Sequence, residues 1–190
     1  MMSLTHKMAK FALAGTILLS NHVQAMEVSG IELPQQITLA QTELQLNGAG
    51  VRSKFFIDLY VGSLYLTSPS SDVTSIINAE DSAVRLNITS GMITADKMRD
   101  AINEGFDDAT MGKTAAIQQE IDSFMALFNE EIKEGDQFTL ATSKALGVTA
   151  YKNGVIQATI EGETFRQALL NIWLGDEPAQ SSLKDDMLGQ

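Results

Sequence analysis

The segment Gly48–Leu66, GAGVRSKFFIDLYVGSLYL, limits the fold more than any other part of the sequence. After its two glycines it is rich in Val, Ile, Phe, Tyr and Leu, and this composition predicts one long, largely buried strand over Lys54–Leu66. The glycines predict a bulge or bend before that strand. Arg52 and Tyr60 are eight residues apart, so they would share one face of a regular strand. We therefore expect a sheet that carries a charge and a phenol on one face.

The other elements follow in an order that predicts a single α+β domain. Strand patterns fall over residues 26–34, 37–47, 83–89, 138–142, 147–152 and 155–160, and helical patterns over residues 72–79, 95–108, 114–132, 163–174 and 181–188. Asn153-Gly154 is a strong signal for a two-residue hairpin turn. Strands, a helical pair, more strands and a terminal helical pair fit an antiparallel sheet with helices on one face.

The first 25 residues have the pattern of a secretory signal peptide. Lys7 and Lys10 precede the apolar run 11–19, and the small-x-small triplet VQA predicts cleavage after Ala25. Residues 26–190 would then form one mature domain, exported to a bacterial periplasm or secreted. The apolar run is too short to span a bilayer and no later segment is long and apolar enough, so we expect no membrane span in the mature chain.

Cleavage would remove both histidines, His6 and His22, and the chain has no cysteine. A mature protein without His or Cys excludes a histidine general base, a Ser-His-Asp or Cys-His nucleophile, zinc held by nitrogen or sulfur, and disulfides. Any catalysis would depend on carboxylates, Lys, Arg, Tyr or main-chain groups.

The charge balance excludes further classes of partner. Of the 13 Lys and Arg residues, two leave with the signal, and all 24 Asp and Glu remain, so the mature net charge is 11 − 24 = −13. Nucleic acids and anionic membranes need cationic surfaces, so neither is an expected partner. No cofactor or metal is expected. The GAG triplet precedes a strand and lacks the Gly-Lys-Ser/Thr of a phosphate loop, and the acidic pairs 107–108 and 130–131 fit a solvated surface.

Arg52 and Tyr60 each allow two interpretations from the residues alone. An arginine after flexible glycines can present its fork of donors to a carboxylate or phenolate. It can also be a surface residue, or a residue paired with Asp58. Tyr60 can offer a phenolic donor or simply pack. A Met and Phe stripe at helical spacing can likewise be core or the wall of an adaptable apolar pocket. Its members are Met98, Ile102, Phe106, Phe124, Met125 and Phe128.

Two segments together resemble the chalcone isomerase superfamily. Residues 46–66, LNGAGVRSKFFIDLYVGSLYL, have its glycine-rich turn, its arginine and the strand ending in a Gly/Ser-Val/Leu-Tyr-Leu pattern. Residues 172–189, IWLGDEPAQSSLKDDMLG, have its closing pattern of an apolar-Gly pair, Ser-x-Leu-Lys and a terminal helix. The similarity covers essentially all of the mature chain and looks closest to the bacterial exported branch. It implies an open-faced β-sandwich, in which a large antiparallel sheet carries a layer of helices over a cleft.

In the plant enzymes of this superfamily the cleft cyclises a chalcone, and the arginine holds the reacting phenolate. In a related fatty-acid-binding branch the same arginine, with a tyrosine, holds a carboxylate. By resemblance the arginine is Arg52. In the plant enzymes a threonine and a tyrosine also order water near the ketone, and an asparagine and a second threonine position the substrate. By resemblance, the first threonine falls on Tyr60 and the second near Ile172. The tyrosine and asparagine of the first long helix fall near Thr94 and Ala101, with Asn103 as an alternative for the asparagine.

The residues and the resemblance together lead to three hypotheses. The first is a non-catalytic protein that binds a fatty acid or similar amphipathic carboxylate in the cleft, with Arg52 and Tyr60 as ligand-binding residues. The second is an intramolecular lyase or isomerase acting on an unsaturated carbonyl compound, with Arg52 stabilising an oxyanion. The third is a structural or interaction protein with a filled cleft and Arg52 paired with Asp58.

Overall fold

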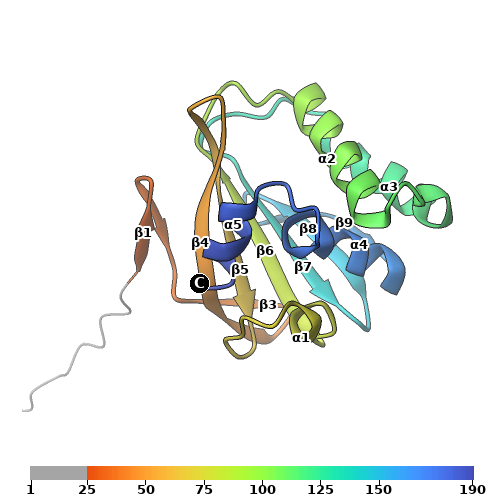
Figure 1. Cartoon of the computed structure of the whole chain (residues 1–190), viewed down its shortest axis with the longest axis horizontal. Helices are drawn as coiled ribbons and strands as arrows, with labels where there is room; N and C mark the ends of the chain where they lie inside the picture. The colour runs from red at the N-terminus through yellow and green to blue at the C-terminus, as the bar shows by residue number, and fades with distance from the viewer. Residues whose placement is uncertain (1–24) are drawn as a thin grey trace, which may run out of the picture.

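The computed structural model describes residues 25–190, and a seven-stranded antiparallel sheet lies at its centre (Figure 1). The strands follow in sequence order from β3 to β9, each paired with the next. Their bounds are β3 Gln36–Leu39, β4 Thr42–Lys54, β5 Ile57–Leu66, β6 Asp81–Ile88, β7 Gln137–Ser143, β8 Gly147–Lys152 and β9 Val155–Ile160. Where one short strand was expected, a separate hairpin of β1 Met26–Val28 and β2 Ile31–Leu33 precedes the sheet. Apart from Ala25, the expected signal peptide lies outside the described residues.

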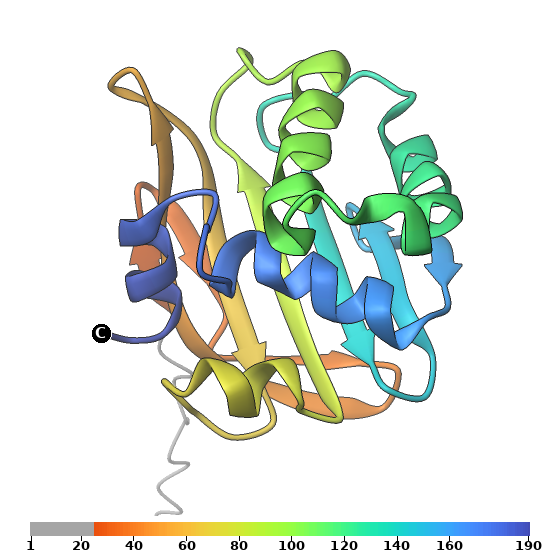
Figure 2. The same ribbon diagram turned by 45° about the vertical axis from the view of Figure 1, so that its right-hand side comes forward.

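The helices lie together on one face of this sheet (Figures 1 and 2). They are α1 Val73–Ile77, α2 Ala95–Thr110, α3 Gln118–Met125, α4 Glu163–Leu174 and α5 Ser181–Met187. This arrangement confirms the predicted α+β class, an antiparallel sheet with a layer of helices. The single helix expected over residues 114–132 is wrong, because α3 is flanked by short 3₁₀ turns. Those turns, Thr114–Ile117 and Ala126–Phe128, each end in a buried apolar residue.

β4 and β5 form a hairpin, and this corrects the prediction of one strand over Lys54–Leu66. The chain reverses at Phe55-Phe56, where both residues have positive φ, 51° and 64°, and Lys54 pairs directly with Ile57. Two central residues with positive φ give the turn that best matches the twist of a two-residue hairpin. Asn and Gly adopt this conformation most easily, and the lack of either residue here hid the turn from sequence reasoning.

The hairpin places Arg52 and Tyr60 on the same face by a different route from the one expected. They lie on neighbouring strands, directly opposite each other in the β4–β5 register. Directly opposite residues of an antiparallel pair point to the same side of the sheet. Tyr60 belongs to the core under the helices, so Arg52 also faces the helical layer. The bulge predicted near the glycines is confirmed by a register shift between Leu46 and Gly48.

Apolar and aromatic side chains fill the core between the sheet and the helices. Aromatic rings contact one another across it, with 5.4 Å between the ring centroids of Phe106 and Phe165 and 5.3 Å between those of Phe128 and Phe138. All members of the predicted stripe are buried except Met125, which packs partly buried against the others. The interpretation of this stripe as core is thus confirmed.

Arg166, on α4, is fully buried and connects this helix to α1. Its Nε and Nη2 donate to the two carboxylate oxygens of Glu163 at 2.6 and 2.7 Å, and Nη2 also donates to the main-chain oxygen of Ile77 at 2.7 Å. Ile77 ends α1, and its carbonyl is one of those that a helix leaves without an internal partner. The hydrogen bonds and positive charge of Arg166 lower the pKa of Glu163. The contact between α4 and α1 therefore depends on an ion pair.

We expect Glu163→Gln to destabilise the protein and to change its response to acid. The substitution leaves Arg166 buried without a counter-charge. Because the Glu163 side chain is 43% exposed, the expected loss is about 1–2 kcal/mol, less than for a fully buried pair. Folding lowers the pKa of Glu163 below its ordinary value of 4.5. The ionised carboxylate therefore stabilises the fold fully above pH 4.5, and this contribution is lost as the pH falls through the pKa of the folded state.

Urea unfolding at a series of pH values checks this expectation. Below pH 4.5, the wild type should lose stability faster than Glu163→Gln. The control is Glu161→Gln, which removes an exposed carboxylate two positions away. Parallel pH profiles for wild type and Glu163→Gln would contradict the role given to this ion pair.

Candidate anion-binding site

Gly48 and Gly50 let α5 pack directly on β4. A Cβ atom on Gly48 would overlap the main-chain oxygen of Asp186, and one on Gly50 would overlap the Asp186 side chain. The glycine-rich turn of the sequence is therefore a place where two segments approach closely. This approach brings Gln180, the residue before α5, onto the strand that carries Arg52.

The side-chain amide of Gln180 makes three hydrogen bonds to β4. Its Oε1 accepts from Nη1 of Arg52 at 3.1 Å and from the main-chain nitrogen of Ser53 at 3.0 Å. Its Nε2 donates to the main-chain oxygen of Val51 at 3.0 Å. Nη1 of Arg52 also donates to the main-chain oxygen of Ser53 at 3.2 Å. Gln180 thus gives the guanidinium a neutral acceptor, where a carboxylate would make a stronger, charge-assisted bond.

Tyr60 lies beside the guanidinium and is hydrogen-bonded to α4. It is 8% exposed, and its hydroxyl oxygen accepts from Nε1 of the buried Trp173 at 3.0 Å. Burial raises the pKa of the Tyr60 phenol, while the Trp173 hydrogen bond and the charge of Arg52 oppose that rise without reversing it. The phenol is therefore neutral near pH 7. Since its oxygen accepts from the indole, its own hydrogen stays available to donate.

The guanidinium of Arg52 is half-buried and lacks a counter-charge. Among residues 25–190, no carboxylate oxygen forms an ion pair with it. Asp58 is exposed and accepts instead from the hydroxyls of Ser53 at 2.8 Å and Ser29 at 3.2 Å. The predicted alternative of an Arg52–Asp58 pair is therefore wrong. A half-buried cation without a partner is unfavourable, and an anion beside it would be favoured.

These groups suit an oxyanion. The guanidinium offers a planar fork of donors that matches a carboxylate, and the Tyr60 hydroxyl adds a donor from the opposite strand. The raised pKa of Tyr60 keeps its phenol protonated near neutral pH. The arrangement can bind an anion and stabilise negative charge, and it provides no general base.

The other positions assigned by resemblance do not join this site. Thr94 is the N-cap of α2, and its Oγ1 accepts from the main-chain nitrogen of Lys97 at 3.3 Å. Ala101 and Asn103 are exposed on α2, and Ile172 is buried in the core. Apart from Asn103, the alternative position for the asparagine, only Arg52 carries the residue type that the resemblance assigns.

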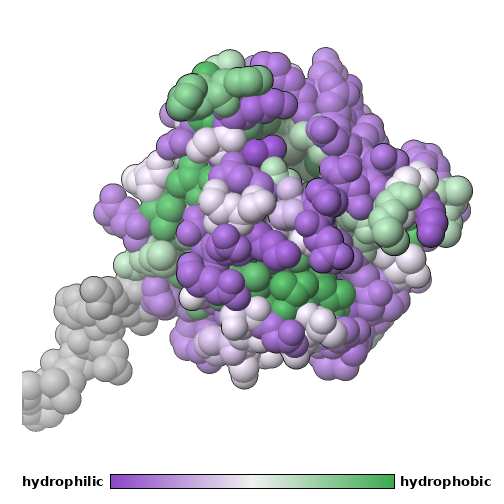
Figure 3. Space-filling view, viewed as in Figure 1, coloured by the Kyte–Doolittle hydropathy of each residue, from purple (hydrophilic) through white to green (hydrophobic). Residues whose placement is uncertain are grey.

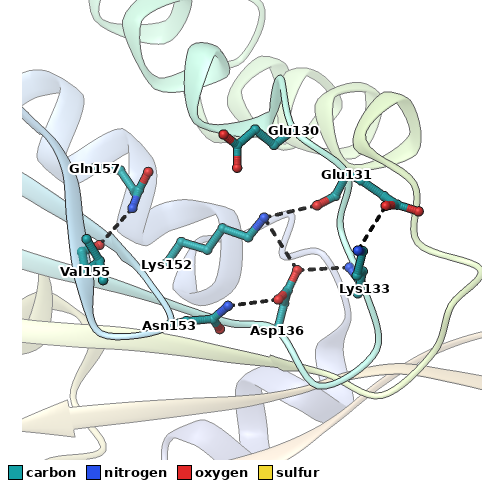
Figure 4. Close-up of a pocket in the computed structure, with 8 residues that line it drawn as sticks. All are labelled: Glu130, Glu131, Lys133, Asp136, Lys152, Asn153, Val155 and Gln157. Carbon is teal, nitrogen blue, oxygen red and sulfur yellow. Dashed lines mark hydrogen bonds and ion pairs between the residues drawn. The ribbon is translucent and has the colours of Figure 1, made fainter.

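A hollow of about 670 Å³ lies elsewhere, where the β8–β9 turn meets the segment before β7 (Figure 4). It is lined by Glu130, Glu131, Lys133, Asp136, Lys152, Asn153, Val155 and Gln157. Two ion pairs lie within it, Lys152–Asp136 at 3.5 Å and Lys133–Glu131 at 3.3 Å, and the amide of Asn153 donates to Asp136 at 2.9 Å. Burial acts to raise the pKa of Asp136, but its hydrogen bonds and the charge of Lys152 lower it overall. This polar hollow is not the apolar cleft that the resemblance implies.

The acidic pairs 107–108 and 130–131 are exposed, as expected for residues of a solvated surface. Within the part of the chain that the structure describes, no three His, Cys, Asp or Glu side chains gather as ligands for a metal ion. In the same residues, no helix is both long and apolar enough to cross a membrane.

Sequence reasoning missed Trp173 and Gln180. Both lie within IWLGDEPAQSSLK, the segment that carries the family resemblance. Another residue of this segment, Lys184, donates to the main-chain oxygen of Gly175 at 2.8 Å and so fixes the turn between α4 and α5. These residues could have been found from the sequence if this segment had been treated as part of the site and not only as a marker of the family.

We expect Gly48→Ala to destabilise the protein by about 1–3 kcal/mol, because the new Cβ meets rigid main-chain oxygens of Asp186 and Met187. Denaturant unfolding, followed by the emission of the single tryptophan, Trp173, measures the change. Gly91→Ala is the control: nothing lies within 4 Å of a Cβ there, so its effect should stay within about 0.5 kcal/mol. Equal effects of the two substitutions would show that α5 does not depend on close approach to β4.

A family model and a solved structure show what this chain is similar to. The family model described as chalcone isomerase-like matches residues 25–189. Among solved structures, a fatty-acid-binding protein of Arabidopsis thaliana is similar, with a TM-score of 0.66 and 17% identity over 84% of this chain and 92% of that one. At this identity the likeness concerns the fold alone. No curated protein matches the chain in sequence. The match to the family model over nearly all described residues shows that the chain belongs to the chalcone isomerase-like family.

Proposed function

We propose that this protein binds a fatty acid or a similar amphipathic carboxylate and catalyses no reaction on it. The observation that carries the proposal is the half-buried guanidinium of Arg52, which has no ion-pair partner within residues 25–190 and lies opposite the buried phenol of Tyr60. A carboxylate would supply the negative charge that this guanidinium lacks.

The carboxylate would take the place of the Gln180 side chain on Arg52. The amide oxygen of Gln180 is a neutral acceptor 3.1 Å from Nη1, and an ionised oxygen at that position makes a shorter and stronger hydrogen bond. The Tyr60 hydroxyl would donate a second hydrogen bond, because Trp173 already occupies its oxygen as a donor. Displacement of Gln180 would also free one end of the short helix α5.

The acyl chain would lie between the sheet and the helical layer. Buried side chains, among them Ile93, Met98 and Trp173, fill this interface, so binding requires some of them to move. Methionine adapts most easily to such changes because it is unbranched and flexible. Each methylene of the ligand that leaves water contributes about 0.8 kcal/mol, which can offset the rearrangement.

The comparisons agree with this proposal at the level of the fold, since the plant protein described as fatty-acid-binding shares this fold.

The alternative, a lyase or isomerase acting on an unsaturated carbonyl compound, has less support. Arg52 could stabilise an oxyanion. However, the hydroxyl of Thr94 caps a helix and Ile172 is apolar, so these two positions bring no further polar group to Arg52.

We expect Arg52→Gln to weaken palmitate binding by about 10- to 100-fold, because a charged hydrogen-bond donor is lost. Tyr60→Phe removes a neutral donor and should weaken binding by about 3- to 10-fold. The emission of Trp173, which contacts Tyr60, reports binding during titration with palmitate, and calorimetry gives the affinity independently.

Arg85→Gln is the matched control for this measurement. Arg85 is also half-buried and forms no ion pair with the described residues, but it lies on the opposite face of the sheet, where its Nε donates to Thr139 at 3.0 Å. This variant should bind palmitate as the wild type does. If the wild type binds no fatty acid, or if both arginine variants lose affinity equally, the proposal is wrong.

Export of the mature chain is also part of the proposal. Its support is the signal pattern of residues 1–25 and the start of β1 at Met26, directly after the expected cleavage site. Terminal sequencing of the protein recovered from the periplasm or medium of a bacterial host should begin at Met26. Recovery of an uncleaved chain in the cytoplasm would contradict export.

A further inference from the structure

The tip of the β4–β5 hairpin exposes two phenylalanines. Phe55 is 84% and Phe56 is 106% exposed, and Ile57 beside them is 37% exposed. The hairpin projects beyond its neighbouring strands (Figures 1 and 2), and Figure 3 shows hydrophobic surface at this projecting end. Met92, on the connection from β6 to α2 at the same end of the molecule, is 50% exposed. This end therefore presents an apolar projection, which we call the Phe tip after Phe55 and Phe56.

Phe55 and Phe56 are poor residues for the turn that they form. Both have positive φ, as have the residues of the other two-residue turns, Ser29-Gly30, Ala40-Gln41 and Asn153-Gly154. Bulky residues rarely adopt positive φ, whereas Asn-Gly favours it. Strained conformations of this kind persist mostly at functional positions. The conformation of this turn therefore does not explain why two aromatic residues occupy it.

The size and shape of the Phe tip fit a lipid bilayer better than a protein. Two phenylalanine side chains offer about 300–500 Å² of contact area. A stable protein interface buries about 1,200–2,000 Å² in total, so the tip alone is too small for one. Insertion into a bilayer needs only apolar groups that reach about 5–10 Å below the surface, and a projecting turn can do so without a matching partner surface.

The charges near the Phe tip favour a bilayer of zwitterionic lipid. Lys54 precedes the tip, and Arg52 lies about 10 Å along the strand from it, so both cations would reach the level of the phosphates when the rings are inserted. The carboxylate of Asp58 is held by the hydroxyls of Ser53 and Ser29. The net charge of the full chain, −11, opposes adsorption to an anionic surface. Attraction would thus come from the tip and not from the overall charge.

We propose that the Phe tip inserts into the surface of a zwitterionic bilayer and docks the protein there reversibly. Insertion would hold the Arg52 end of β4 at the level of the lipid headgroups, where amphipathic carboxylates in a membrane have their charged ends. Docking is a property of the tip and does not depend on whether Arg52 binds a fatty acid.

Flotation of the purified protein with phosphatidylcholine vesicles tests the proposal. Wild type should float with the vesicles at low and high salt alike, because the attraction is apolar. The double variant Phe55→Asn/Phe56→Gly should partition at least about tenfold less. The same variant supplies the residues that the turn prefers, so its denaturant midpoint should equal or exceed that of wild type. Loss of flotation would then not be a result of misfolding.

Two further variants serve as controls. Val155→Ser/Ile156→Ser removes an apolar pair on β9 that is 63% and 61% exposed, and it should float as wild type does. Phe55→Trp/Phe56→Trp keeps the aromatic tip, so it should also float, with a blue shift of its emission on vesicles. The vesicles contain no fatty acid, so a failure of docking and a failure of fatty-acid binding are separate results.

Two results would overturn docking directly: wild type that does not float, or a Phe55→Asn/Phe56→Gly variant that floats as well as wild type. A third is a wild-type dimer, seen by sedimentation equilibrium without vesicles, that Phe55→Asn/Phe56→Gly abolishes. In that case the Phe tip would be a surface for self-association.

Discussion

The β4–β5 pairing holds the guanidinium of Arg52 opposite Tyr60, and the remaining parts of the candidate site are arranged around that charge. Two neutral oxygens, the amide of Gln180 and the main chain of Ser53, accept hydrogen bonds from it. No described carboxylate neutralises it, although the chain carries 24 Asp and Glu residues. Desolvation makes such a cation costly, and the proposed carboxylate ligand would supply the missing negative charge.

Long-range packing determines what surrounds this charge. The absence of side chains at Gly48 and Gly50 lets α5 lie against β4, and the turn after α4 delivers Gln180 to Arg52. Trp173, at the other end of that turn, reaches Tyr60. The two segments that resemble the chalcone isomerase superfamily therefore supply the two halves of the candidate site. The Phe tip belongs to the first of them, so the candidate anion site and the apolar projection lie on a single hairpin.

Local signals predicted much of the fold. Thr94 caps α2, Asn153-Gly154 forms the β8–β9 turn, and α4 spans Glu163–Leu174 as its pattern indicates. Each of these depends on residues within a few positions of one another. The reversal at Phe55-Phe56 could not be predicted in this way, because its residues contradict the turn preferences that sequence reasoning uses. The pairing of Arg52 with Tyr60 was predicted on one face for the wrong reason, an even spacing along one strand.

The candidate site could likewise be predicted only in part. Arg52 and Tyr60 could be named from the sequence, whereas Gln180 lies 128 positions from Arg52 and Trp173 lies 113 positions from Tyr60. No periodicity links residues at such separations, and only the fold brings them together.

The ionisation state of a bound ligand tests the role of Arg52 most directly. Palmitate labelled with ¹³C at its carboxyl carbon gives an NMR signal that moves when the group takes up a proton. Beside the guanidinium, the bound carboxylate should stay ionised at pH values where the free acid is protonated, because a nearby positive charge lowers its pKa. In Arg52→Gln the bound signal should titrate at higher pH or disappear. A wild-type pKa raised by apolar burial, and unchanged in Arg52→Gln, would show that Arg52 does not hold the anion.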